Sequence, residues 1–463
     1  MKTFSRRDFL TTAGAAAGSV MLSSPVHGSS RKKRIVLVGT GVRGTGFWGR
    51  NIVQQYSDLV EFVGLCDINP GRLKFARSFM GIDCSVYTDF DTMIRETNPD
   101  MVIVTTVDAT HHQYIVKSLD LGLDVLTEKP MTTDERKCQE ILDAERRSGK
   151  ELIVGFNYRW APYMTKIKDL LHKQSIGNVR TVDFHWYLNT YHGASYFRRW
   201  HGQREYSGTL WVHKATHHFD LLNWWIDSEP VEVFAYGDLE HYGSNHSFRG
   251  DKCRTCPHKE KCKFFWDITE NEHYMNLYVA NEKYDGYIRD NCLFRHEINI
   301  YDKMSAQIKY ANGVIVNYSL TTYSPFEGWR TAFNGFDGRL EAWLDIPWIS
   351  GASVDQAEMH AAEMDQGASA AEQYEPIIVH NNWQKHNVIK VPHSRGGHGG
   401  GDKRMQDRIF LDPNAPDPLG HAAGSRDGAM SILIGIAARK SIESGEAVRI
   451  AELTDLQPRE KRL

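Results

Sequence analysis

The sequence predicts two domains of different class: an α/β domain with a parallel sheet over residues 31–158, and an α+β domain with an open, mainly antiparallel sheet over residues 159–455. Three observations support this division. Apolar residues 35–38 lead directly into a glycine-rich turn at 39–44. From there to about residue 156, apolar runs alternate with amphipathic stretches, which is typical of βαβ units. Beyond residue 160 the strand-like runs alternate in polarity instead.

The turn at 39–44 has the spacing of a dinucleotide-binding loop. Gly39 permits the tight turn, Gly41 lets backbone N–H groups approach a pyrophosphate, and Gly44 lets the following helix pack closely on the strand. A helix N-terminus then supplies further N–H groups and a positive dipole. We therefore assign the loop, with its intervening residues Thr40, Val42 and Arg43, to the cofactor site of a Rossmann domain. An ordinary structural turn is the alternative.

The second predicted strand, residues 60–67, indicates which cofactor binds. It ends at Asp67, where an acidic residue accepts hydrogen bonds from the adenosine ribose hydroxyls. Because a carboxylate there repels a 2′-phosphate, NAD is favoured over NADP, although Arg72 follows a few residues later.

The other elements of the first domain follow in alternation. We predict a strand over 99–106, a helix over 111–122 that ends at a glycine, and a short strand over 124–130 that is broken by Pro130. A helix over 134–148 and a strand over 152–156 complete the domain.

Glu128-Lys129-Pro130, together with Thr106, His111 and the run Val154–Arg159, resembles the Gfo/Idh/MocA family, named for glucose–fructose oxidoreductase and inositol dehydrogenase. The resemblance implies that Lys129 lies beside the nicotinamide and the substrate hydroxyl, where an ammonium stabilises a developing alkoxide and can pass a proton. It places Thr106, His111 and Glu128 at the cofactor, and Tyr158 and Arg159 at the substrate. The family often has Thr-Pro where this chain has Thr106-Val107.

In the second domain we predict strands over 180–187, 231–236, 304–310 and 313–318, and a final helix over 425–444 with an apolar, core-facing stripe. The family resemblance implies the same α+β architecture. Its open sheet also makes a homo-oligomer, a dimer or tetramer, the expected assembly.

The segment 207–225 carries the candidate acid–base groups. The family usually shows an Asp, a His four residues later, and another acid; here His217 matches the His, Asp220 matches the later acid, and His213 replaces the first Asp. Residues four apart on a helix share a face. His217 is therefore the candidate general base and His213 a second acid–base group. A two-His metal site is the alternative, but no third ligand is apparent.

An insertion over 237–296 holds Cys253, Cys256, Cys262 and Cys292. The Cys-x-x-Cys pair with a nearby third Cys has the spacing of a structural zinc site, and in an oxidising compartment the same four residues could form two disulfides. Both alternatives give the cysteines a structural role.

The glycine-rich stretch 393–402 presents His398 and Asp402 as its polar groups near a ligand. A similar Gly-His-Gly-Gly stretch occurs in the family's NAD-dependent glycosidase branch, so we expect it at the substrate pocket. A flexible surface loop is the alternative.

The N-terminus carries a twin-arginine motif, Ser5-Arg6-Arg7-Asp8-Phe9-Leu10, before an Ala/Gly-rich run over 11–22. That run is too short to span a bilayer, and no Cys follows it as a lipid anchor. We expect residues 1–30 to be a signal peptide for twin-arginine export, to the periplasm or beyond, with no stable membrane anchor. The net charge of −3 gives no general attraction to nucleic acid.

These observations together predict an exported, NAD-dependent oxidoreductase that acts on a sugar or glycoside hydroxyl. Because there is no pool of free NAD outside the cytoplasm, we expect the cofactor to stay bound and to be recycled within the catalytic cycle. One alternative is an NAD-dependent glycosidase that works by transient oxidation at C3 and elimination. Another is a non-catalytic sugar- or NAD-binding protein.

Overall fold

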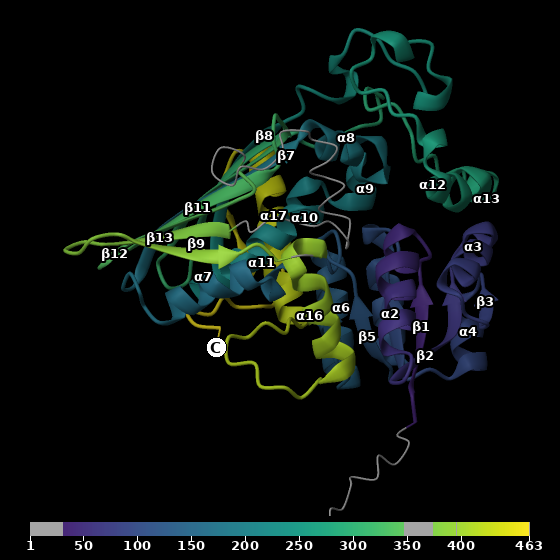
Figure 1. Ribbon diagram of the computed structural model, residues 1–463, viewed down its shortest axis with the longest axis horizontal. Coiled ribbons are helices and arrows are strands. Elements are labelled where there is room, and N and C mark those ends of the chain that lie inside the picture. Colours follow the sequence, from purple (N-terminus) through teal and green to yellow (C-terminus); the bar gives the residue numbers. More distant parts are fainter. Residues whose placement is uncertain (1–30, 347–373, 395, 463) are drawn as a thin grey trace, which may run out of the picture. The chain divides into compact units, whose positions relative to one another are not determined.

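The computed structural model describes residues 31–346, 374–394 and 396–462 (Figure 1). The described residues from Lys33 onward form one compact unit. The predicted signal peptide, residues 1–30, lies outside the described residues, and the boundary predicted at residue 158 stays a prediction. Among the helices that are described, none combines the length and the apolarity needed to cross a membrane.

The first sheet is parallel and has the strand order β3-β2-β1-β4-β5-β6. The order reverses between β1 and β4, and the crevice at the carboxyl ends of such strands is where ligands bind in this architecture. The inner strands are buried on both faces, which explains their continuous apolar runs. The strands are β1 (Lys33–Val38), β2 (Val60–Cys66), β3 (Ser85–Tyr87), β4 (Met101–Val104), β5 (Asp124–Thr127) and β6 (Leu152–Val154).

Helices connect these strands, and their ends are marked by local capping. The side chains of Asn69, Asp89 and Asp134 accept hydrogen bonds from the first-turn amides of α3, α4 and α6. The segment after the glycine loop begins with a π-wound stretch, η1, and continues as α2. The helices are η1 (Arg43–Arg50), α2 (Asn51–Tyr56), α3 (Pro70–Met80), α4 (Phe90–Thr97), η2 (Asp108–Thr110), α5 (His111–Asp120) and α6 (Glu135–Ser148).

The second sheet has the order β14-β13-β12-β11-β7-β10-β9-β8-β15. Its pairs are antiparallel except for β7 with β10, so the predicted fold class is confirmed. β7, β8, β9 and β10 match the predicted strands, whereas the others were not predicted. The strands are β7 (Val179–Asn189), β8 (Pro230–Asp238), β9 (Lys303–Tyr310), β10 (Ile315–Ser324), β11 (Gly328–Gly335), β12 (Gly338–Leu344), β13 (Tyr374–Asn381), β14 (Asn387–Pro392) and β15 (Val448–Arg449).

Two buried helices, α11 (Ala215–Ile226) and α17 (Ser425–Ser444), pack against each other, and α17 also packs on β8. A Cβ at Gly435 would lie 2.3 Å from the carbonyl oxygen of Trp211, so glycine is what allows α17 to approach α10 (Leu210–His213). The core position predicted for residues 425–444 is therefore confirmed. The other helical segments of this part are η3 (Tyr158–Trp160), α7 (Pro162–His172), α8 (Thr190–Arg198), η4 (Trp200–Gly202), α9 (Arg204–Ser207), η10 (Gly397–Gly400), α16 (Gly401–Gln406), η11 (Asp407–Leu411) and η12 (Ile450–Glu452).

The insertion between β8 and β9 consists of short helical turns and one isolated β-bridge, Lys252 with Asn291. Helix α12 of the insertion packs on α3, one of the helices that connect the strands of the first sheet, and Figure 1 shows α12 and α13 beside α3. The insertion therefore reaches the edge of the glycine loop. Its elements are η5 (Gly243–Asn245), η6 (Cys253–Thr255), η7 (Lys259–Lys261), η8 (Ile268–Glu270), α12 (Glu272–Leu277), η9 (Val279–Asn281) and α13 (Glu282–Asp285).

Candidate active site

A cavity of about 1520 Å³ lies at the carboxyl edge of the first sheet and extends to the insertion, α8 and α10. Most of the predicted site residues line it. These are Gly39, Gly41, Val42, Arg43, Asp67, Thr106, His111, Glu128, Lys129, Tyr158, His213, His217 and His398. Four predicted residues, Thr40, Gly44, Arg159 and Asp402, are not part of the lining.

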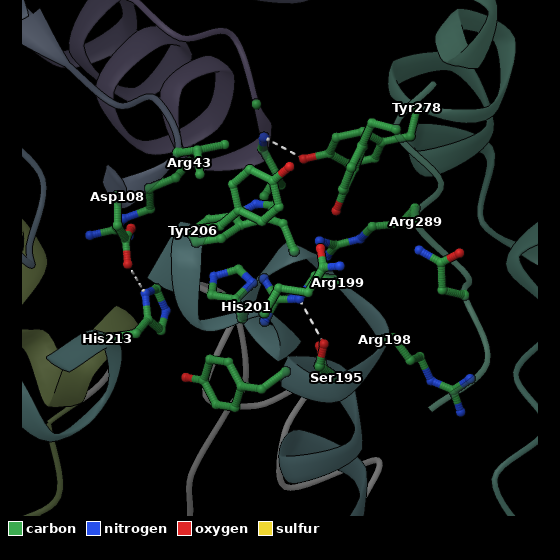
Figure 2. Close-up of a pocket in the computed structure, with 18 of the residues that line it drawn as sticks. Arg43, Asp108, Ser195, Arg198, Arg199, His201, Tyr206, His213, Tyr278 and Arg289 are labelled. Atoms are coloured by element: carbon green, nitrogen blue, oxygen red, sulfur yellow. Dashed lines mark hydrogen bonds and ion pairs between the residues drawn. The ribbon is translucent and has the colours of Figure 1, made fainter. Parts of the chain in front are cut away.

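The glycine loop fits the phosphates of a dinucleotide. Gly39 has a φ of +93°, and a Cβ there would lie 2.6 Å from the Thr105 carbonyl, so the turn needs glycine. At Gly41 the nearest atom to an added Cβ is the Tyr278 hydroxyl at 3.6 Å, which leaves the loop open toward the cavity. The backbone N–H of Val42 donates to that hydroxyl at 2.9 Å (Figure 2), which links the loop to the insertion.

Thr40 and Gly44 support the loop from behind. The Thr40 N–H and hydroxyl both donate to Asp67 Oδ2, at 2.7 and 2.9 Å. A Cβ at Gly44 would lie 2.2 Å from the Gly39 carbonyl oxygen, so this glycine serves close packing, as predicted. Thr40, predicted to bind the cofactor, directs both of its donors to Asp67 and does not line the cavity, so it supports the loop through Asp67.

Asp67 lies at the predicted end of β2 and is largely satisfied by protein groups. Its Oδ1 accepts from the Asn69 N–H at 2.8 Å and from Arg72 at 2.9 Å. Arg72 also pairs with Asp285 of the insertion at 2.6 Å. Two carboxylates therefore balance the charge of Arg72.

Glu128 and His111 hold the loops around Lys129. Glu128 Oε1 accepts from Arg43 Nε and Trp48 Nε1, both at 2.6 Å. The ring nitrogens of His111 lie 2.9 Å from the Pro130 carbonyl oxygen and 3.1 Å from that of Thr106. The Lys129–Pro130 peptide bond is cis. These contacts fix the direction in which Lys129 enters the cavity.

Lys129 lines the cavity beside the segment that carries His213. Its Nζ donates to the His213 carbonyl oxygen at 3.3 Å. Burial lowers the pKa of Lys129 to about 8, against the opposing influence of Glu128 and Asp108. An ammonium with this pKa changes its charge near neutral pH.

His213 and His217 do not share one continuous helix as predicted, because α10 ends at His213 and α11 begins at Ala215. Both still line the cavity. His213 Nδ1 lies 2.6 Å from Asp108 Oδ2, in the turn after β4 (Figure 2). Burial lowers the pKa of His213 and raises that of Asp108. A carboxylate from the turn after β4 thus orients His213.

His217 lies edge-on to the ring of Tyr158, with ring centroids 4.9 Å apart. Its Nδ1 is buried without a hydrogen-bond partner. Burial lowers the pKa of His217 well below its usual range, with the charge of Lys129 acting in the same direction. The ring is therefore neutral at neutral pH and can accept a proton.

The prediction that Arg159 contacts substrate was wrong. Its side chain is fully buried, donates from Nε to Asp220 Oδ2 at 2.7 Å, and lies 3.2 Å from Asp427. Arg159 thereby connects η3 to α11 and α17. Asp220, the later acid of the family pattern, is the partner of this arginine and not of His217.

Asp402 was likewise predicted at the substrate but lies behind His398. Its Oδ1 accepts from Asn157 Nδ2 and lies 3.1 Å from His398 Nδ1, and its Oδ2 lies 3.8 Å from Arg43. His398 lines the cavity and packs edge-on against Tyr158, at 4.9 Å. Asp402 therefore positions His398.

The four cysteines of the insertion line one small cavity together, and all are free thiols. In the described part of the chain, the His, Cys, Asp and Glu side chains close enough together to hold a metal ion are Asp345, Glu375 and His393. Neither the cysteines nor His213 with His217 form such a group there. In the structure the four cysteines thus form neither disulfides nor a preformed zinc site.

Sequence reasoning missed several cavity residues: Asp108, Arg199, His201, Tyr278 and Arg289. Asp108 follows the carboxyl end of an inner parallel strand, where ligand-binding residues gather, so its position was a usable signal. The others come from the ends of short helices and from the insertion, and no local pattern marks them.

Comparisons with known proteins agree with this geometry. Residues 33–156 match the family described as "Oxidoreductase family, NAD-binding Rossmann fold", and residues 168–450 match its C-terminal alpha/beta domain. YteT of Bacillus subtilis is 36% identical over 92% of this chain and 99% of its own length. An inositol 2-dehydrogenase/D-chiro-inositol 3-dehydrogenase of Lactiplantibacillus plantarum is 24% identical over 43% of this chain and 56% of its own length.

Solved structures show the same fold at low identity. An oxidoreductase from Agrobacterium radiobacter in complex with NAD+, L-tartaric acid and magnesium superposes with a TM-score of 0.60 at 14% identity, over 91% of this chain and 99% of that one. The WlbA dehydrogenase from Bordetella pertussis, in complex with NADH and UDP-GlcNAcA, gives 0.59 at 17% identity, over 90% and 99%. With both domain models matched in order along one chain, this protein belongs to the Gfo/Idh/MocA family of oxidoreductases.

Proposed function

We propose that this protein oxidises a hydroxyl of a sugar or glycoside with NAD that it keeps bound, and that the NADH formed is reoxidised in place by a second substrate that carries a carbonyl group. One observation carries the proposal: Lys129, His217 and the His213–Asp108 pair meet in the cavity whose other end is the glycine loop. The inositol dehydrogenases among its relatives act on polyols, as their names state. NAD is favoured over NADP because Asp67 and Asp285 already neutralise Arg72, the cation nearest to where a 2′-phosphate would lie.

Each residue of the site has a separate role in the proposed reaction. When bound, NAD supplies the acceptor for the hydrogen and electron pair that leave the substrate carbon. The neutral ring of His217 accepts the proton of the reacting hydroxyl. The Lys129 ammonium stabilises the negative charge that develops on the oxygen. Tyr158 and His398 form the aromatic wall beside His217.

Contacts between the insertion and the first sheet support retention of the cofactor. Besides the bond from Val42 to Tyr278, Asn69 Nδ2 donates to the Asn281 carbonyl oxygen at 3.0 Å, and Asp285 pairs with Arg72. These contacts place insertion residues over the loop that binds phosphates, so the cofactor has to pass them to leave.

Glycoside cleavage without net oxidation is a second candidate, favoured by the His213–Asp108 pair. A ketone formed transiently in the sugar acidifies the neighbouring C–H, and elimination of the C1 substituent then needs a second acid–base group. His213 is available for that role because its neutral ring is held by a carboxylate.

Cofactor release tests the proposal directly. The protein is purified without added NAD and denatured, and the supernatant is analysed by absorbance and mass spectrometry. Stoichiometric NAD or NADH supports retention, whereas a cofactor-free protein that binds NAD weakly contradicts it. Candidate glycosides are then mixed with the holoenzyme, and the products separate keto-sugar formation from bond cleavage.

Export through the twin-arginine pathway, a dimeric or tetrameric assembly, and a structural role of the four cysteines remain part of the proposal. Cell fractionation with Arg6 and Arg7 replaced by Lys tests export, and light scattering gives the assembly. Metal analysis with thiol titration distinguishes zinc from disulfides, which the free thiols around one cavity leave as alternatives for the mature protein.

A further inference from the structure

Three arginines that line the cavity, Arg198, Arg199 and Arg289, have no carboxylate partner among the described residues. Arg198 is held by the insertion, where it donates to Cys253 Sγ at 2.8 Å and to the Phe264 carbonyl oxygen. Arg199 follows α8, and its Nε donates to the Ser195 carbonyl oxygen at 2.8 Å. Arg289, from the insertion, lies against the rings of Tyr274 and Tyr278, at 4.9 and 5.1 Å. Figure 2 shows the guanidinium groups of Arg199 and Arg289 side by side, pointing into the cavity.

This arrangement is costly without an anion. Burial lowers the pKa of Arg199, and the charge of Arg289 is the next largest cause. The pKa of Arg289 is instead raised, because Tyr287, Tyr278 and Tyr274 stabilise its charged form against the effect of burial, so the cost falls on Arg199. Three other arginines at the cavity have carboxylate partners: Arg43 pairs with Glu128 and Asp402, Arg72 with Asp67 and Asp285, and Arg295 with Glu297. Buried charges are normally paired, so a pair of adjacent, unneutralised guanidinium groups indicates a site for an anionic group.

The position of Arg199 locates that group near the reacting atoms. The charge of Arg199 lowers the pKa of both His201 and His213, so it acts at the end of the cavity where Lys129 lies. The nearest acid, Asp108, is already bound to His213. The phosphates of the cofactor have their own donors in the glycine loop.

We propose, resting on the function proposed above, that the sugar substrate carries a carboxylate, as in a uronic acid, and that Arg199 and Arg289 bind it. A planar guanidinium matches a carboxylate with two parallel hydrogen bonds, which fixes the orientation of the sugar ring as well as binding it. The two arginines thus determine substrate class, while His217 and Lys129 act on the hydroxyl.

Paired substrates test the proposal in the holoenzyme. Methyl glucuronides and galacturonides are compared with the methyl glucosides and galactosides and with the uncharged uronamides, and reduction of the bound cofactor is followed at 340 nm. The wild-type enzyme should prefer the uronides. Arg199→Gln and Arg289→Gln should each raise KM for the uronides by about 10- to 100-fold. The neutral sugars should be unaffected, and Arg199→Lys should restore part of the difference.

Controls distinguish a substrate carboxylate site from a cofactor phosphate site and from failure of the proposed function. Arg249→Gln changes an exposed arginine of the same insertion, outside the cavity, and should leave every KM unchanged. Equal effects on charged and neutral sugars would overturn the carboxylate site, and loss of bound NAD from the arginine variants would show that the anion is a cofactor phosphate. If no sugar reduces the cofactor, the proposed function fails. Equilibrium dialysis then measures glucuronate binding to the wild type and to the Gln variants. If the wild type does not bind glucuronate, or if all the proteins bind it equally, the proposed anion site is overturned.

Discussion

Replacing Lys129 with Met removes the positive charge that the proposed mechanism places beside the reacting oxygen. A charge-assisted hydrogen bond to a buried group contributes about 1.5–3 kcal/mol, which corresponds to about 10- to 150-fold in rate. We therefore expect turnover of Lys129→Met to fall by about 10- to 150-fold, with NAD still bound.

The pH dependence gives the same prediction an independent test. Because burial lowers the pKa of Lys129 to about 8, the ammonium is present below that pH and is lost above it. The kcat/KM of the wild type should therefore decline above about pH 8. His217, whose pKa lies well below its usual range, stays neutral across the plateau and limits the rate only at acidic pH. Lys129→Met should lack the alkaline decline.

The assay is stopped-flow reduction of the bound cofactor across pH 5–10. Lys168→Met is the matched control, because burial also lowers the pKa of Lys168 to about 8, but its ammonium donates to the Trp224 carbonyl oxygen away from the cavity. The control should keep the rate and pH profile of the wild type even if it unfolds at a lower temperature. Turnover of Lys129→Met within a few-fold of wild type, or an unchanged alkaline decline, would refute the assigned role.

Three further substitutions test separate parts of the site. His217→Asn should lower turnover about 100-fold or more without loss of NAD, and wild-type kinetics would mean that another group is the base. Tyr278→Phe removes the hydroxyl at the Val42 amide and should speed NAD release about 10-fold in dialysis, whereas unchanged release would argue against the insertion as a barrier. Asp220→Asn leaves Arg159 with Asp427 alone and should lower the free energy of unfolding in urea by about 3 kcal/mol, with bound NAD retained; an unchanged midpoint would mean that Asp427 suffices.

Local physics explains why the cofactor domain was predictable from sequence. A strand buried on both faces must be continuously apolar, and the turn at Gly39 admits no side chain. A few residues of sequence are therefore enough to recognise β1 and its loop. The same holds for α17, whose buried stripe was recognised before its partners were known. Each of these features depends on a short stretch of chain.

Features that depend on distant partners were not predictable. Arg159 is next to Tyr158 in sequence, yet one side chain is buried against Asp220 and the other lines the cavity. Nothing in the local pattern distinguishes the two, because the acids that bury Arg159 come from α11 and α17. Strands β11–β14 were missed for a related reason. Charged residues such as Arg330 and Glu341 interrupt the apolar pattern, and which of their neighbours are buried becomes clear only when the pairing with β7 and β13 is known.

The histidine at position 213 shows how a departure from the family pattern can be compensated in space. Replacing the usual acid with His213 removes a carboxylate one turn before His217, and the structure places Asp108 2.6 Å from the replacing ring. The carboxylate now orients His213, while no acid among the described residues holds a ring nitrogen of His217. Oxidation of a hydroxyl needs one base, which a neutral His217 provides unaided. A second histidine held by a carboxylate is more than that reaction requires, and this surplus is the structural reason to look for bond cleavage as well as keto-sugar formation.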